Sequence, residues 1–123
     1  MTYPVNTFYS STHSSISANG AAPTSIFDTS TIPVGGYAMI LGIIGANKST
    51  STRGLNLTLK KSGVSTPAYL LFDVALPPQT SFQVISGDKL VIQRGDTLVA
   101  WADSAGTNNL DLVVSYVVYT PAS

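Results

Sequence analysis

The C-terminal run from Leu110 to Tyr119 constrains the fold most strongly, because apolar residues recur in it at every second position. Successive side chains of a β-strand point to opposite faces, so this period is typical of an antiparallel sheet with one face on a core. The face predicted to point inward carries Leu110, Leu112, Val114, Tyr116 and Val118. The run therefore predicts a long strand that packs on a hydrophobic core.

Shorter apolar segments at 80–85, 90–92 and 97–102 precede this run. They are separated by 86–89 and 93–96, where Ser, Gly, Asp, Gln, Lys and Arg gather. Glycine supplies positive φ angles, and the Asp side chain bonds nearby backbone groups, so such clusters reverse the chain. We therefore expect strands joined by tight turns at both clusters.

The first two thirds of the chain contain further strand candidates, at 25–30, 37–47, 55–60 and 68–74. Turn residues bound them, and Gly42 and Gly45 inside the second candidate indicate a bulge or a close backbone approach. Helical periodicity is absent from the sequence. We predict an all-β fold, a single antiparallel β-sandwich of about eight strands that resembles a jelly roll. Its predicted core includes Leu55, Leu57, Leu59, Leu110, Leu112 and Val114.

Composition limits the partners of the chain. Its 123 residues suit one domain, and there is no cysteine for disulfides or thiolate metal sites. Only 10% of the residues are charged and the net charge is zero, so we expect no nucleic-acid partner. The sequence has neither a signal peptide nor an apolar run long enough for a membrane helix, so we also expect no membrane partner. Low charge with 44% hydrophobic residues favours self-association.

Residues 1–25 are polar, with aromatic anchors at Tyr3, Phe8 and Tyr9. We interpret them as an extended N-terminal arm that precedes a sandwich domain at 26–123. An ordered arm must pair its backbone with a sheet edge, since fixing each residue costs about 1–2 kcal/mol of conformational entropy. We expect this edge to belong to a neighbour, either a sister copy in a homo-oligomer, with a trimer as the first hypothesis, or a different protein beneath it. Removal of residues 1–22 is then expected to leave a folded sandwich.

A search for catalytic and metal-binding patterns gives no site. His13 is the one histidine and lies in a polar tract, and no nucleophile–base pair can be assigned to it. Oxygen ligands for calcium gather at Asp103, Asn108, Asn109 and Asp111, but an Asn-rich hairpin turn explains them better. We therefore predict no catalytic residues, no metal and no cofactor.

Trp101 is the single tryptophan and shares a strand face with Val99. Most such residues belong to a core or an interface. The other interpretation is that Trp101 stacks on a ligand such as a sugar.

Four short motifs in the last third carry a family resemblance: Pro77-Pro78, Ser86–Val91, Gly95–Leu98 and Val114-Ser115-Tyr116. Together with the order of strands and turns after residue 30, they resemble small β-sandwich virion proteins of tailed bacteriophages, including cyanophages. Residues 1–25 depart from that pattern. The resemblance implies a non-enzymatic structural protein of the virion, assembled in the host cytoplasm. It favours a capsid decoration or cement protein that contacts other virion proteins such as the major capsid protein.

Three alternatives stay open. The chain could serve in the neck, tail or baseplate. A carbohydrate-binding or receptor-binding tail module would expose Tyr37, Tyr69 or Trp101 together beside polar loops. An enzyme has only scattered Asp residues in its favour.

Overall fold

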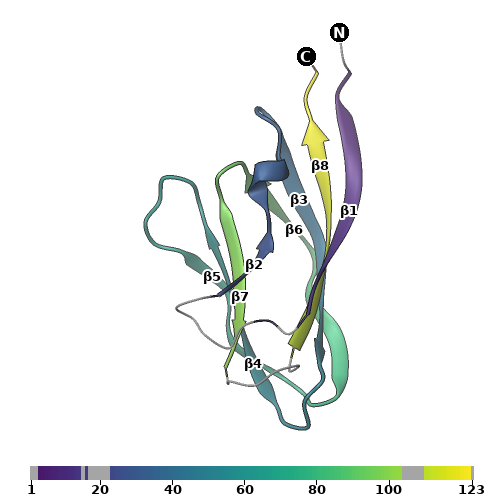
Figure 1. Ribbon diagram of the computed structural model, residues 1–123, viewed down its shortest axis with the longest axis vertical. Coiled ribbons are helices and arrows are strands. Elements are labelled where there is room, and N and C mark those ends of the chain that lie inside the picture. The colour runs from purple at the N-terminus through teal and green to yellow at the C-terminus, as the bar shows by residue number, and fades with distance from the viewer. Residues whose placement is uncertain (1–2, 15, 17–22, 104–109, 123) are drawn as a thin grey trace.

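A computed structural model describes residues 3–14, 16, 23–103 and 110–122. Its two antiparallel sheets pack as a sandwich, which confirms the predicted all-β class (Figure 1). The elements are β1 (Val5–His13), β2 (Thr24–Phe27), the 3-10 turn η1 (Thr29–Thr31), β3 (Tyr37–Asn47), β4 (Arg53–Lys60), β5 (Ala68–Leu76), β6 (Thr80–Gln93), β7 (Thr97–Ala102) and β8 (Leu110–Thr120). Among the described residues, none belongs to a helix long and apolar enough to cross a membrane.

The strand order is that of an eight-stranded jelly roll. One sheet has the order β1-β8-β3-β6 and the other has the order β2-β7-β4-β5. Consecutive strands lie in different sheets except for β4 and β5, so almost every connection crosses the sandwich. This winding brings the first and last strands together as neighbours.

The core lies between the sheets and contains the residues that the alternation predicted. Leu55 and Leu57 of β4 are at most 1% exposed, and Leu110, Leu112 and Val114 of β8 are equally buried. Leu59 is partly buried and packs against this cluster. Burial of each such side chain contributes about 1.5–3 kcal/mol, so the period of two in the sequence marks the main source of stability.

Residues 5–13 lie within the sandwich and not apart from it. They form strand β1, which pairs antiparallel with β8 of the same chain from Val5 opposite Thr120 to His13 opposite Leu112. The start of β1 and the end of β8 lie side by side at one end of the molecule (Figure 1). The boundary expected between residues 25 and 26 falls inside β2. Residues 5–13 join the sheet because β3 covers only one side of β8. On the other side, the backbone N–H and C=O groups of β8 need hydrogen-bond partners, and the extended N-terminal segment provides them.

The turn expected at 86–89 does not form, because β6 continues from Thr80 to Gln93. Ile40 of β3 pairs with Leu90, and Gly42 pairs with Ser86, so one residue of β3 faces three of β6. The Ser-Gly-Asp-Lys cluster is therefore accommodated within the ladder as an irregular bulge. The described residues still form eight strands, because the merger of two expected strands is balanced by β1.

The expectation of a bulge near Gly42 is confirmed on the other side of β3. Ile40 pairs with Tyr116 and Gly42 pairs with Ser115, so Leu41 is an extra residue relative to β8. The bulge reverses the alternation along β3, and it thereby keeps both Ile40 and Ile43 in the core.

Candidate functional site

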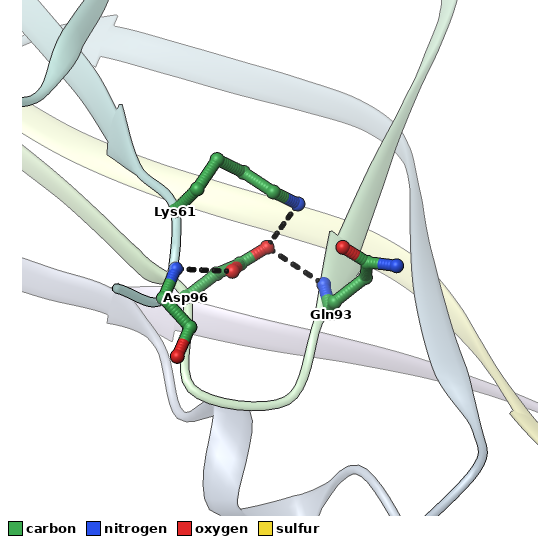
Figure 2. A network of polar contacts seen from close by, with 4 residues as sticks. Lys61, Gln93 and Asp96 are labelled. Atoms are coloured by element: carbon green, nitrogen blue, oxygen red, sulfur yellow. Dashed lines mark hydrogen bonds and ion pairs between the residues drawn. The ribbon is translucent and has the colours of Figure 1, made fainter. Parts of the chain in front are cut away.

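The carboxylate of Asp96 is buried at the turn between β6 and β7. The Asp96 side chain is 1% exposed and forms an ion pair with Lys61. Its carboxylate also accepts hydrogen bonds from the backbone N–H of Gln93, at 2.8 Å, and of Ser62, at 3.0 Å (Figure 2). Burial raises the pKa of Asp96, but the bonds from Lys61, Gln93 and Ser62 and the charge of Lys61 outweigh it and hold this pKa below its ordinary value. All these bonds lock two loops together.

His13 lies at the end of β1 and is half-buried. Its Nε2 atom is 3.1 Å from the Ser11 hydroxyl. Burial lowers the pKa of His13, and a backbone hydrogen bond to Ile26 of the opposite sheet opposes this in part. His13 therefore links the two sheets.

The oxygen cluster considered for calcium is only partly described. Asn108 and Asn109 lie outside the described residues, and Asp111 forms an ion pair with Lys48 at 3.1 Å. In the described part of the chain, no group of three or more His, Asp or Glu residues could hold a metal ion.

The outer surface of the β1-β8-β3-β6 sheet carries a continuous apolar row, which we call the apolar face. Register places Phe8 of β1 opposite Val117 of β8, Val117 opposite Met39 of β3, and Met39 opposite Val91 of β6. The flanking positions are Tyr37, Leu41, Ile44, Val113 and Tyr119. Large apolar side chains thus span all four strands on the side away from the core.

Several of these side chains are open to solvent: Phe8 is 71% exposed, Ile44 47% and Val91 46%. Tyr37 and Tyr119 stack on one another with ring centroids 5.0 Å apart. Among the side chains that the structure describes, the charged groups of this surface are Asp111 and its ion-pair partner Lys48, both at one end. Exposed apolar patches of this extent are typical of interaction surfaces.

The three aromatic residues predicted as arm anchors do not act together. Tyr3 precedes β1 and is 77% exposed, and Phe8 belongs to the apolar face. Tyr9 points to the other side of β1, where it stacks on Tyr116 with ring centroids 5.4 Å apart. Tyr116 in turn meets Phe27 of β2 edge to face at 4.6 Å. Tyr9 therefore fastens β1 to its own domain.

A hollow of about 440 Å³, which we call the aromatic hollow, lies on the outer surface of the β2-β7-β4-β5 sheet. Trp101 meets Tyr69 there, with ring centroids 5.9 Å apart and ring planes at 68°. Its lining consists of Pro23, Thr58, Lys60, Pro67, Tyr69, Thr97, Val99 and Trp101. Of the three aromatic residues named for a carbohydrate module, the structure brings together Tyr69 and Trp101, while Tyr37 lies on the apolar face.

A bulge in β5 completes this aromatic group. Between the pairs Leu55–Val74 and Leu57–Leu71, β4 has one residue, Asn56, whereas β5 has Phe72 and Asp73. Asp73 adopts φ of 48°, and its N–H donates to Asn56 Oδ1 at 2.9 Å. A Cβ at Gly54 would overlap the Asp73 carboxylate, so glycine leaves the space for this conformation. A positive φ at a non-glycine residue costs on the order of 1–3 kcal/mol.

The bulge leaves Phe72 72% exposed and edge to face with Tyr69, at a centroid distance of 5.0 Å. Sequence reasoning missed Phe72 and the bulge. A signal existed, because Asp73 interrupts an otherwise apolar strand. Phe72, Tyr69 and Trp101 together form a string of aromatic side chains on one sheet surface.

Comparison with one solved structure supports the fold. A chain of the Bacillus endospore appendages, a family of disulfide-linked pili, superposes with a TM-score of 0.53 at 13% identity, over 98% of this chain and 90% of that one. A chain of the infectious bursal disease virus Gx strain gives a TM-score of 0.44 at 12% identity, over 99% of this chain but only 38% of the viral one. No protein-family profile matches the sequence. No curated protein matches it either.

Proposed function

We propose that this chain is a non-enzymatic structural protein of a tailed-bacteriophage virion, a capsid decoration or cement protein that works through subunit contacts. The observation that carries the proposal is the apolar face. The sequence resemblance to small phage virion proteins supports the assignment to a phage virion. Neck, tail or baseplate positions are the alternatives within the same class.

The sheet that carries the apolar face has the size for contact with a second copy of the chain. Strands about 4.8 Å apart that rise about 3.3 Å per residue give a surface of about 700 Å² for four strands as long as β3, which has 11 residues. A standard interface buries about 800 Å² on each partner. Among the described side chains of this surface, the charges are those of the Asp111–Lys48 pair, which cancel, and the chain has zero net charge, so two copies meet without repulsion.

Two of the buried polar side chains support a structural role. Asp96 and Asn47 are 3% and 1% exposed, and their hydrogen bonds go to loops and strand ends of this chain. The similar endospore appendages are described as disulfide-linked, but this chain has no cysteine. Its assembly would therefore rest on noncovalent burial of apolar surface.

The test of assembly is the molar mass of the purified protein by light scattering during gel filtration, as a function of concentration. We expect an oligomer, with a trimer as the first hypothesis, that Val91→Lys reduces to a monomer. Val64→Lys is the matched control, because Val64 has the same side chain and a similar exposure, 48% against 46%, but lies in the β4–β5 loop. A monomeric wild-type protein, or an oligomer that Val91→Lys leaves intact, would contradict the proposal.

The test of location is mass spectrometry of gradient-purified particles of the phage that encodes this chain, with heads and tails separated. A decoration protein should be present in heads at a fixed ratio to the major capsid protein. Its presence in tails alone would favour the neck, tail or baseplate alternatives. Absence from intact particles would overturn the virion assignment.

A further inference from the structure

We propose that the aromatic hollow binds a sugar ring of a glycan, and that it prefers an acidic sugar to its neutral counterpart. The hollow lies on the sheet opposite to the apolar face, so both surfaces can be occupied at once. This binding function goes beyond the proposed structural role.

The walls of the hollow suit a compact ring. Tyr69 of β5 stands opposite Thr58, and Trp101 of β7 stands opposite Asn56, so the two aromatic rings approach each other across β4. Thr58 is 2% exposed and forms a small floor between them. Since the ring planes meet at 68°, they form a corner and not a flat plate. A pyranose offers one face of C–H groups to such rings and hydroxyl groups around its rim.

The polar groups of the hollow match this ligand. Lys60 and Thr97 stand opposite one another on β4 and β7, next to the aromatic corner. Within the part of the chain that the structure describes, the Lys60 ammonium makes no ion pair, and neither threonine side chain is hydrogen-bonded. These groups can therefore bind sugar oxygens without breaking internal bonds.

The positive charge of Lys60 favours acidic over neutral sugars. Among the described residues that line the hollow, Lys60 is the one with a charge, and none carries a carboxylate. A ligand carboxylate would therefore meet a cation without an opposing anion, and a charge-assisted hydrogen bond is about twice as strong as a neutral one. This asymmetry favours a uronic acid or a similar acidic sugar.

The β5 bulge is a second, independent observation at the same place. Asn56 lies opposite Trp101 and holds Asp73 in its strained conformation, which leaves Phe72 beside Tyr69. Bulges and strained residues gather at ligand sites, where they redirect side chains. The volume, about 440 Å³, falls within the range of roughly 300–1,000 Å³ that small-molecule sites occupy. A proline-rich peptide would need an extended groove between parallel ridges, which a corner does not provide.

The experiment uses the fluorescence of Trp101, because it is the only tryptophan and any change reports on this hollow. The full chain is titrated to millimolar concentration with cellobiose, with its uronic-acid counterpart and with a proline-rich peptide. We expect a saturable change with both sugars and tighter binding of the acidic one. The preference for the acidic sugar should diminish as salt screens the charge.

Variants locate the site. Tyr69→Ala should weaken binding of both sugars by roughly tenfold, as the loss of a stacking ring does elsewhere. Lys60→Gln should abolish the preference for the acidic sugar and spare the neutral one. Tyr3→Ala is the control, because Tyr3 is exposed and outside the hollow, and it should bind like wild type. Tyr69 is 50% exposed, so its replacement should leave the fold intact, which circular dichroism verifies.

Three results would overturn the proposal: no fluorescence change with either sugar, undiminished sugar affinity in Tyr69→Ala, or a response to the peptide alone. Equal affinity of the wild-type protein for both sugars would overturn the acidic preference. None of these readouts depends on the oligomeric state, so they are independent of the assembly test.

Discussion

Gln93 and Asp96 exchange two hydrogen bonds across the turn between β6 and β7. The Asp96 N–H donates to the Gln93 carbonyl at 3.1 Å, and the Gln93 N–H donates to the Asp96 carboxylate at 2.8 Å. Gly95 between them has φ of 92°, a conformation that suits glycine. The same carboxylate binds Lys61 and Ser62 of the β4–β5 loop, so one side chain fixes both loops at this end of the sandwich.

The first prediction concerns Asp96→Asn. The variant keeps the shape but loses the charge, and its amide group would place a donor against a donor, so we expect a loss of about 1.5–3 kcal/mol in unfolding free energy. Urea unfolding at pH 7 measures this loss. Asp103→Asn is the control with the same change of charge at an exposed position, and it should cost less than about 0.5 kcal/mol.

The pH dependence follows from the lowered pKa of Asp96. Its contribution is present above the unfolded pKa of about 3.9 and is lost as the pH falls through the folded value. The difference in stability between wild type and Asp96→Asn should therefore shrink below about pH 5. A difference that stays constant down to pH 2 would contradict the assignment.

The second prediction concerns Asn47, a buried residue at the end of β3. Its amide donates to the carbonyls of Ser51 and Leu76, both at 3.0 Å. Its Oδ1 accepts from the Ser49 N–H and hydroxyl, at 3.0 and 2.8 Å. Asn47→Ala leaves the buried Leu76 carbonyl without this partner, so we expect a loss of about 2–4 kcal/mol.

Thermal and urea unfolding measure the effect of Asn47→Ala, with Asn6→Ala on the exposed side of β1 as the comparison. The Asn6 variant should change stability by less than about 1 kcal/mol. Equal losses of unfolding free energy in the two variants would show that the hydrogen bonds of Asn47 do not stabilise the fold.

The third prediction tests the core. Leu112 is 1% exposed, whereas the next residue, Val113, is 36% exposed on the other face of β8. Leu112→Ala should cost about 2–5 kcal/mol because it leaves a cavity between the sheets. Val64→Ala, at a position that is 48% exposed in the β4–β5 loop, should cost less than about 1 kcal/mol in the same denaturant titration. A loss below about 1 kcal/mol for Leu112→Ala would contradict its place in the core.

The alternation of apolar residues predicted the fold class, because a strand with one buried face carries an apolar side chain at every second position. Leu55, Leu57, Leu110 and Leu112 are examples, and all are buried as expected. Glycine and aspartate did not distinguish turns from bulges, because a chain reversal and a bulge both need residues that adopt unusual backbone angles. Residues 93–96 form the expected turn, whereas 86–89 stay within β6.

The candidate sites were harder to predict, because they depend on which strands become neighbours. Trp101 and Tyr69 are 32 positions apart in the sequence and meet only because β7 and β5 flank β4. The apolar face likewise needs the register of four strands. For residues 1–25, the sequence showed that a sheet edge was needed but not which chain would supply it.

The last prediction replaces the expectation that the sandwich folds without its N-terminus. Residues 5–13 contribute a full ladder to β8, and Tyr9 covers Tyr116. Ile16, at 3% exposure, extends this attachment because its N–H donates to the Leu110 carbonyl at 3.0 Å. Deletion of residues 1–13 should therefore lower the unfolding free energy by several kcal/mol, with each lost hydrogen bond contributing about 0.5–1.5 kcal/mol. The uncovered edge of β8 should also promote aggregation.

Two point variants keep this prediction testable if the deletion does not fold. Tyr9→Ala removes the stack on Tyr116 and should cost about 1–2 kcal/mol, whereas Tyr3→Ala removes a side chain that is 77% exposed ahead of β1 and should cost less than about 0.5 kcal/mol. Urea unfolding of the four proteins, wild type included, gives the comparison, and light scattering follows aggregation of the deletion. If the shortened chain unfolds at the wild-type midpoint and stays soluble, and if Tyr9→Ala costs no more than Tyr3→Ala, β1 is dispensable to its own domain. The segment would then be free to pair with a neighbouring subunit.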